Sequence, residues 1–278
     1  MTALRRGRTN LWIELVLAAA IVATVFPTAW IFWNSFKFSR EIVNPIHPLS
    51  FTLFNYGDLF AGTSEFSHLF VNSLVLVVCT TLLCLGIGSL AAYSLSKYRW
   101  PRAFTLIVLA FVLFIQLIPP VALVPSYYVI LNNLHLYNTI AGLVVVNTVF
   151  NLPFALLLLK VYFDTLPNEL RDSALVDGCS AAGAFRRIML PLAAPGFGAA
   201  TILVAILTWN EFLMALSLTS TPDAQTITVG IASFIQQYSV RYGDMSAAAA
   251  LATIPIIILA IFAHRYIVSG LTRGAVKG

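Results

Sequence analysis

The sequence contains few charged residues. Asp, Glu, Lys and Arg make up 10% of its 278 residues, whereas 59% are hydrophobic and the mean hydropathy is +0.89. A soluble domain carries about a quarter charged residues on average. The scarcity of charge excludes a soluble globular protein and indicates a protein of the lipid bilayer.

Motifs that would give the chain its own chemistry are also missing. It has no G-x-x-x-x-G-K-[ST] phosphate loop, so it does not itself hold and hydrolyse ATP in that way, and it has no H-E-x-x-H or G-x-S-x-G motif. Its three cysteines suggest no disulfide framework, and its four histidines are scattered without the spacing of a metal site. We therefore expect neither an enzyme nor a metal or cofactor bound by this chain.

Long hydrophobic runs are what the sequence does contain. Six stretches each have roughly 20 or more mostly apolar residues, the length that an α-helix needs to cross a bilayer. They predict an all-α integral membrane protein with a single transmembrane domain of six helices. The expected spans cover about residues 11–33, 69–96, 104–125, 139–161, 196–219 and 247–268.

The basic residues indicate the orientation in the membrane. Six spans place both termini on one side, and all 16 lysines and arginines except Lys37, Arg40 and Arg241 fall in the segments of that side. By the positive-inside rule this side is the cytoplasm. We therefore expect a cytoplasmic (inner) membrane protein with both termini in the cytoplasm. The net charge of +5 then reflects topology, and no nucleic-acid partner is implied.

The N-terminal apolar run could be mistaken for a secretory signal, because arginines precede it. Its apolar core is interrupted by Glu14, and its hydrophobicity continues through Trp33. We expect a retained first span.

The most informative polar segment lies between the fourth and fifth spans, at residues 167–195, and we call it the elbow. Its glycines and prolines divide it into two short helices. The first is predicted over residues 168–176, because Asp177-Gly178 allows a left-handed backbone beyond a helix end. The second begins after Ser180, a good N-cap, and Pro191 is expected to set its end.

The elbow resembles the signature EAA-x3-G-x9-I-x-LP of permease subunits of ABC importers. The matching positions are Asp172-Ser173-Ala174, Gly178, Ile188 and Leu190-Pro191, with the spacing of the signature throughout. Asp172 and Ser173 depart from the usual Glu and Ala, but they keep a charge and a small side chain. The resemblance implies a cytoplasmic coupling element that docks on an ATP-binding subunit.

Two further stretches are similar to the carbohydrate branch of this family, and to its second-permease, maltose-type members. They are Trp209-Asn210-Glu211-Phe212 and the tail Gly270–Gly278, which resembles the ending G-L-T-x-G-A-V-K-G. The resemblance implies a permease subunit of a binding-protein-dependent sugar importer. Its implied partners are a second permease, two ATP-binding subunits that hold ATP and Mg, and an extracytoplasmic solute-binding protein on the outer loops, about residues 34–68 and 220–246.

Physical chemistry supports a docking role for the elbow. Its helices can lay an apolar side into a groove of a partner, with Phe185, Ile188 and Met189 on the second helix, while Arg171 and Asp172 fix the register. The alternative is an amphipathic loop on lipid headgroups, which would carry a more basic face. The residues expected to take part in ATPase coupling are Glu169, Asp172, Ser173, Ala174, Asp177, Gly178, Phe185, Ile188, Leu190 and Pro191.

Polar residues inside the spans are candidates for a solute path, because uninterrupted apolar helices offer a solute nothing to bind. For the amides the alternative is hydrogen bonding between helices. For Glu211 it is a contact with another subunit, since a carboxylate inside the membrane must face a cavity or a partner. The candidates are Gln116 beside Pro119-Pro120, Asn147 and Asn151 in the fourth span, and Asn210 and Glu211 in the fifth.

Three other functions compete with a sugar-importer subunit. A self-sufficient secondary transporter or channel would need ionisable residues for ion coupling, and the only carboxylates in the spans are Glu14 and Glu211. A membrane-embedded enzyme would need a nucleophile, a base and an orienting group, which no motif here supplies. A glycerol-3-phosphate importer permease belongs to the same class, but its anionic solute would favour cations in the path, and no Lys or Arg lies mid-span.

Overall fold

The structure, a computed structural model, describes residues 11–44, 50–61, 65–235 and 240–275, and beyond Phe262 it describes the backbone alone. Within these residues all regular secondary structure is helical, apart from one isolated β-bridge between Ile235 and Val240. The expected all-α fold is confirmed. The basic residues before Leu11 and the end of the tail, Val276–Gly278, lie outside the described residues.

The chain forms two compact units, residues 1–64 with 231–253 and residues 65–230 with 254–278. The first unit holds α1 (Leu11–Asn34), α2 (Ser39–Val43), α3 (Phe54–Ala61) and the start of α14 (Tyr242–Ala275). The second holds α4 (Phe66–Lys97), α5 (Arg102–Leu117), α6 (Pro120–Asn133), α7 (Ile140–Thr165), α8 (Asn168–Val176), α9 (Ala181–Ala184), a π-helical turn (Phe185–Met189), α10 (Leu190–Leu192), α11 (Ala194–Trp209), α12 (Leu213–Leu218) and the beginning of α13 (Ile227–Ser233).

Four helices are long and apolar enough to cross a membrane. They cover Trp12–Asn34, Phe66–Lys97, Ile140–Thr165 and Tyr242–Phe262. Two further candidates are bent helix pairs, Arg102–Leu117 with Pro120–Asn133 and Ala181–Leu192 with Ala194–Trp209. The described residues therefore offer four spans, or up to six if each bent pair counts as one. Six spans with both termini on one side stay a prediction.

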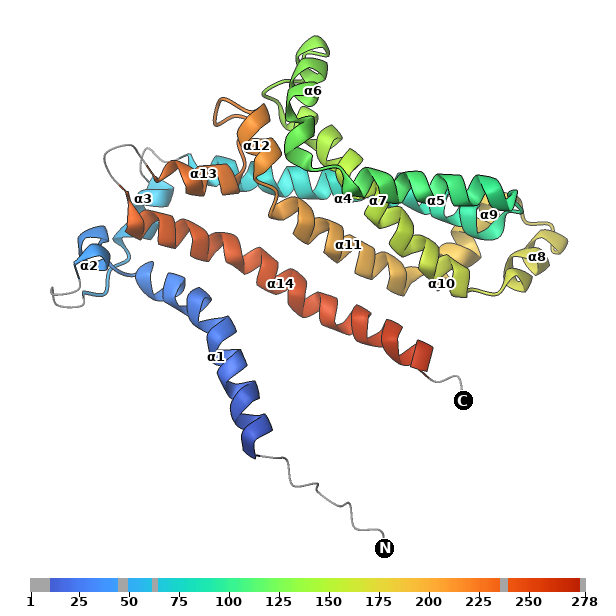
Figure 1. The fold of residues 1–278 in the computed structure, drawn as a ribbon, viewed down its shortest axis with the longest axis horizontal. Coiled ribbons are helices and arrows are strands. Elements are labelled where there is room, and N and C mark those ends of the chain that lie inside the picture. Colours follow the sequence, from blue (N-terminus) through green and yellow to red (C-terminus); the bar gives the residue numbers. More distant parts are fainter. Residues whose placement is uncertain (1–10, 45–49, 62–64, 236–239, 276–278) are drawn as a thin grey trace, which may run out of the picture. The chain divides into compact units, whose positions relative to one another are not determined.

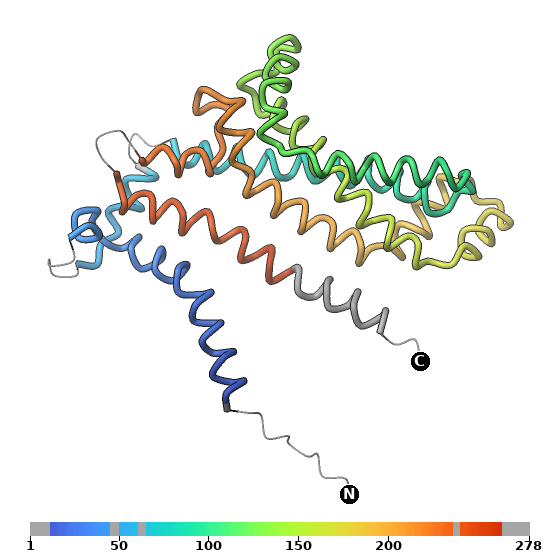
Figure 2. The backbone as a smooth tube through the Cα atoms, viewed as in Figure 1, coloured from blue at the N-terminus to red at the C-terminus, as the bar shows by residue number. Residues whose placement is uncertain are grey.

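The bend between α5 and α6 follows from two consecutive prolines. Pro119 and Pro120 lack the N–H that a helix interior needs, and a residue before proline is pushed out of the α region. Ile118, before Pro119, has an extended backbone with φ −74° and ψ 121°. Pro120 then opens α6, where a missing N–H is tolerated. The chain bends by 96° between the two helices, visible as a sharp turn in Figure 2.

The second unit is built on α4, α7 and α11, which lie side by side (Figure 1). Small residues let their backbones approach, as expected for helices in a membrane. Gly88 of α4 faces Ala155 and Leu156 of α7, and a Cβ added at Gly88 would lie 3.5 Å from the Leu156 backbone nitrogen. Ala92 and Ala200 are buried in the same core. At one end of this three-helix core α6 and α12 pack together, and the elbow lies at the other end.

Gly196, at the start of α11, is expected to tolerate no larger residue. A Cβ added there would overlap the Tyr162 side chain of α7 and would lie 2.7 Å from the Tyr162 Cβ. We expect Gly196→Val to lower the free energy of unfolding by about 1–3 kcal/mol, the usual cost of overpacking. The measurement is the melting temperature of the purified protein in detergent.

Gly86→Ala in α4 is the matched control for this prediction. A Cβ added at Gly86 has no neighbour within 4 Å, and alanine reduces the entropic cost of glycine in a helix. Gly86→Ala is therefore expected to melt at the wild-type temperature or above it. If Gly196→Val also melted at the wild-type temperature, the close contact between α7 and α11 would be wrong.

Candidate functional site

The turn in the middle of the elbow is closed by Gly178. α8 ends at Val176, as the sequence predicts, and Gly178 has a left-handed backbone with φ +84°. The Gly178 N–H donates to the Leu175 carbonyl at 3.2 Å, and the Cys179 N–H donates to the Ala174 carbonyl at 2.9 Å. This pair of bonds is a Schellman motif, whose left-handed position is usually glycine.

The second half of the elbow is an irregular helix. The Ser180 hydroxyl accepts a hydrogen bond from the Gly183 N–H at 3.1 Å, so Ser180 is the N-cap that the sequence predicts. α9 then widens into the π-helical turn, and α10 carries the helix past Pro191 before the chain bends by 75° into α11. The expected helix end at Pro191 is therefore wrong. Pro191 lies inside the helix, shortly after the π-helical turn, and the helix ends one residue later at Leu192.

The predicted coupling residues fall into two groups by exposure. Those on the exposed face of the elbow are Glu169, Asp172, Ser173, Asp177, Gly178 and Pro191. Those that pack wholly or partly within the chain are Ala174, Phe185, Ile188 and Leu190. The exposed group is the part of the elbow that a partner can reach in this conformation. A role in ATPase coupling stays a prediction for both groups.

The apolar side of the second elbow helix, predicted to fill a groove of a partner, packs against the chain itself in this structure. Met189 is fully buried. The Phe185 ring lies 4.8 Å from the Tyr93 ring of α4 and 6.3 Å from the Phe163 ring of α7. Ile188 packs against the same cluster. These apolar residues therefore pack on α4, α7 and α11, and their docking on a partner stays a prediction.

Arg171, expected to fix the register against a partner, faces α4 of its own chain. Its guanidinium carbon lies 4.7 Å from the centre of the Tyr98 ring. The Arg171 side chain is 19% exposed, whereas that of the adjacent Asp172 is 64% exposed. Sequence reasoning missed this arrangement, because no local signal links Arg171 to residues 74 positions earlier.

Asn147 and Asn151 lie in the interior of the three-helix core. Asn147 donates to the Leu143 carbonyl at 3.0 Å, and Asn151 donates to the Asn147 carbonyl at 2.9 Å, each one turn back in α7. The Asn151 amide also lies 3.5 Å from the Thr208 hydroxyl of α11. The contact with Thr208 favours helix–helix bonding for Asn151, whereas the bond that Asn147 makes stays within α7. Their role in a solute path stays a prediction.

Glu211 caps a break inside the predicted fifth span, between α11 and α12. Its carboxylate accepts hydrogen bonds from the N–H groups of Met214 at 2.6 Å and Ala215 at 3.0 Å. These are first-turn donors that have no partner within α12 itself. The Thr228 hydroxyl donates to the Glu211 carbonyl at 2.8 Å. Sequence reasoning singled out Glu211 but not this cap, because neither glycine nor proline marks the break.

The other two polar candidates, Gln116 and Asn210, are exposed and lie beside helix breaks. Gln116 is in the last turn of α5, next to the 96° bend, and Asn210 is the C-cap of α11. Asn210 donates to the Ile206 carbonyl at 2.8 Å. Broken helices commonly supply the polar groups of transport sites. Gln116 and Asn210 thus keep the geometry expected of a solute path, which stays a prediction.

The loop that follows α12 is anchored at the end of the core opposite to the elbow. Asn72 of α4 donates to the carbonyls of Pro222, Asp223 and Gln225 at 3.0–3.1 Å. Asn138, between α6 and α7, accepts from two N–H groups of the same loop at 2.8 and 3.1 Å. The first part of the predicted outer loop is therefore anchored by side chains of α4 and of the turn between α6 and α7.

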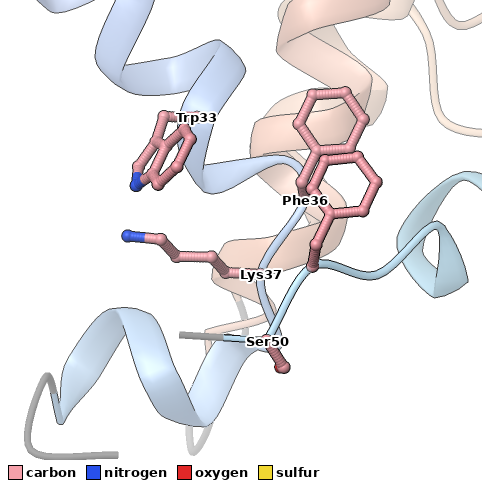
Figure 3. Close-up of a pocket in the computed structure, with 5 residues that line it drawn as sticks. Trp33, Phe36, Lys37 and Ser50 are labelled. Atoms are coloured by element: carbon pink, nitrogen blue, oxygen red, sulfur yellow. The ribbon is translucent and has the colours of Figure 1, made fainter. Parts of the chain in front are cut away.

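In the first unit, a small aromatic pocket of about 60 Å³ lies at the end of α1 (Figure 3). The Lys37 ammonium lies 5.3 Å from the centre of the Trp33 ring, and the Phe36 and Phe51 rings stack at 4.7 Å. Small-molecule pockets measure roughly 300–1,000 Å³. The pocket is therefore too small for a sugar, and these contacts instead attach the end of α1 to the segment that follows it.

Arg241, one of the few basic residues predicted on the outer side, is also engaged locally. It pairs with Asp58 of α3 and with Asp244 of α14, the latter at 2.8 Å. The Gly243 N–H donates to the Ser39 hydroxyl at 3.0 Å. These contacts join α2 and α3 to the start of α14. In the described part of the chain, no group of three or more His, Cys, Asp or Glu is placed to hold a metal ion.

Comparison with known proteins identifies the family. The sequence profile of the "Binding-protein-dependent transport system inner membrane component" family matches residues 84–273, which is more than half of the chain and includes the elbow. The chain belongs to this family. It is thus a membrane-spanning transport subunit, and the resemblance found in the elbow and in Trp209–Phe212 is confirmed.

Two relatives in this family of inner membrane components match over nearly their whole length. The trehalose transport system permease protein SugB of Mycobacterium tuberculosis is 37% identical over 98% of each chain. The sulfoquinovosyl glycerol transport system permease protein SmoH of Agrobacterium fabrum is 34% identical over 94% of this chain and 93% of its own.

A solved structure shares the fold. It is a chain in the crystal structure of a bacterial ABC transporter involved in the import of the acidic polysaccharide alginate. The TM-score is 0.79, with 96% of this chain and 99% of that chain covered, at 19% sequence identity. At this identity the likeness shows a common fold alone.

Proposed function

We propose that this chain is a permease subunit of an ATP-driven sugar importer and that it forms the translocation path with a second, similar permease. The observation that carries the proposal is the full-length similarity to permeases named for trehalose and for sulfoquinovosyl glycerol transport. Both solutes contain a sugar, but one is neutral and the other carries a sulfonate. The sugar class is therefore better supported than the charge of the solute.

In this proposal the elbow is cytoplasmic and couples the permease to two ATP-binding subunits, which bind ATP and Mg. A solute-binding protein delivers the sugar to the outer loops, as the name of the family suggests. Two observations support separate docking surfaces for the ATP-binding subunits and for the solute-binding protein. The exposed face of the elbow carries Glu169, Asp172 and Asp177, and the loop anchored by Asn72 and Asn138 lies at the opposite end of the core.

The identity of the solute is tested with the complete importer, reconstituted in liposomes with both permeases, the ATP-binding subunits and the binding protein. We expect ATP-dependent uptake of at least one labelled sugar from a panel of trehalose, maltose and a sulfonated glycoside. Uptake of glycerol 3-phosphate alone would favour the polyol-phosphate alternative. Uptake driven by an ion gradient without ATP would favour a secondary transporter.

The isolated chain is expected to be inactive. In liposomes it should neither hydrolyse ATP nor accumulate sugar, because it lacks a phosphate loop and a partner permease. The measurements are phosphate release and uptake of labelled sugar, with the complete importer as the positive control. ATP-stimulated uptake by the lone polypeptide would overturn the assignment as a subunit.

A further inference from the structure

Lys97 holds the joint between α7 and the elbow. Lys97 is the last residue of α4, and its ammonium donates to the carbonyl of Leu166 at 2.6 Å. Leu166 is the C-cap of α7, and only Pro167 separates it from α8. A cation at the C-terminus of a helix satisfies a free carbonyl and interacts favourably with the helix dipole. Lys97 itself is 7% exposed, so this contact is internal to the chain.

Arg171 makes a similar contact one helix further along the chain. From α8, its guanidinium nitrogen Nη1 lies 3.4 Å from the Lys97 carbonyl, at the C-terminus of α4. Its guanidinium carbon lies 4.7 Å from the centre of the Tyr98 ring. The hydrogen bond is long, so stacking on the ring is the stronger constraint. A planar guanidinium stacks on an aromatic face in a way that an ammonium does not.

The second half of the elbow is attached to the same two helices. Phe185 packs on Tyr93 of α4 and on Phe163 of α7, and Met189 is buried beside them. α11 follows only after the 75° bend. A displacement of the elbow therefore acts on α4 and α7 through these contacts, and on α11 both through the bend and through Ala200 and Phe197, which pack in the same cluster.

We propose that Lys97, Tyr98 and Arg171 are positioning residues that make α4 and α7 move together with the elbow. This proposal rests on the proposed coupling function of the elbow. α8 has two faces, because Asp172 and Val176 are exposed whereas Arg171 is held against α4. A partner that pushes on the exposed face would rotate α8 about the joint at Leu166-Pro167. Without the two cations, the joint at Leu166-Pro167 would let α8 turn while α4 stayed in place.

The test uses the complete importer in liposomes and measures sugar transported per ATP hydrolysed. Arg171→Gln and Tyr98→Leu should still co-purify with the ATP-binding subunits and hydrolyse ATP, because both keep the side chains of the exposed face of α8. Arg171→Gln removes one ion pair with Asp172 at 3.3 Å, and an exposed pair of this kind contributes little. Their transport ratio should fall about five-fold or more, the lower end of the usual coupling between linked sites. Lys97→Met should behave in the same way.

Two controls distinguish loss of the contacts made by Lys97, Tyr98 and Arg171 from a general loss of structure. Tyr98→Phe keeps the ring face on which Arg171 stacks, so it should keep the wild-type transport ratio. Thr253→Ala removes a hydrogen bond of 2.7 Å to the Ala249 carbonyl within α14 and touches none of the three residues, so it should also leave the ratio unchanged. Melting temperatures identify any variant that fails to fold. Tyr98 is 41% exposed, so Tyr98→Leu removes little buried surface beyond the edge contact of its ring with Tyr93 at 6.0 Å.

Wild-type transport ratios for both Arg171→Gln and Tyr98→Leu would overturn the proposal. So would loss of the ATP-binding subunits from Arg171→Gln complexes, since Arg171 would then belong to the docking face. The double variant should lose less than the two single losses combined, because both changes remove the Arg171–Tyr98 contact. Failure of the proposed function itself gives a different result, in which the wild-type complex does not assemble or transports no sugar.

Discussion

Gly178→Val is expected to lower recruitment of the ATP-binding subunits by this chain about five- to thirty-fold, the effect of losing roughly 1–2 kcal/mol. Gly178 has φ +84°, a conformation that costs an L-residue about this much and a β-branched residue more. A Cβ added there has no neighbour within 4 Å, so the cost comes from the backbone and not from crowding. The turn at Gly178 would open, and the second half of the elbow would point in a different direction.

The measurement is the stoichiometry of ATP-binding subunits pulled down by the permease, together with the hydrolysis rate in liposomes. Membrane insertion should survive, because the apolar helices are untouched. Gly178→Asn is the matched control, since asparagine tolerates the left-handed region, and it should stay near wild type. Normal recruitment and hydrolysis by Gly178→Val would reduce the elbow to a passive surface loop.

Glu211→Ala is expected to abolish most transport while leaving insertion intact. The change removes the acceptor of two N–H groups, those of Met214 and Ala215, which lie in buried residues. Each buried donor left unsatisfied costs about 1–3 kcal/mol. The start of α12 should fray, and the loop that follows α12 should be held less firmly.

Uptake kinetics and the yield of the assembled complex measure this effect. Glu211→Gln keeps an acceptor oxygen for α12 and should lose less activity than Glu211→Ala. Glu14→Ala is the second control, because Glu14 is the other acidic residue within a predicted span and is exposed in α1. Wild-type uptake and yield for Glu211→Ala would show that the cap has no role in transport.

Much of this architecture follows from short-range chemistry that can be recognised in the sequence. The length of an apolar run is enough to predict a membrane helix. The bounds of α8 depend on Gly178, and the start of α9 depends on the Ser180 hydroxyl, each of which acts within a few residues of itself. The bend between α5 and α6 likewise depends on Pro119-Pro120 alone. The family signature in the elbow also lies within one short segment, residues 172–191.

The direction in which the elbow side chains point was decided only by the tertiary structure. An apolar pattern predicts that Phe185 and Met189 are covered, but it does not say whether a partner or the chain's own α4 and α7 covers them. A charge pattern does not place Arg171 on Tyr98, because that contact depends on how α4 and α8 meet.

The break before α12 is a third feature that only the tertiary structure showed. Glu211 stabilises the break by capping α12, but no proline or glycine there predicts it. The sequence by itself therefore determined the membrane class, the apolar stretches and the turn of the elbow, since each depends on neighbouring residues. The inward contacts of the elbow depend on helices whose meeting points are set by packing far along the chain, and they required the tertiary structure.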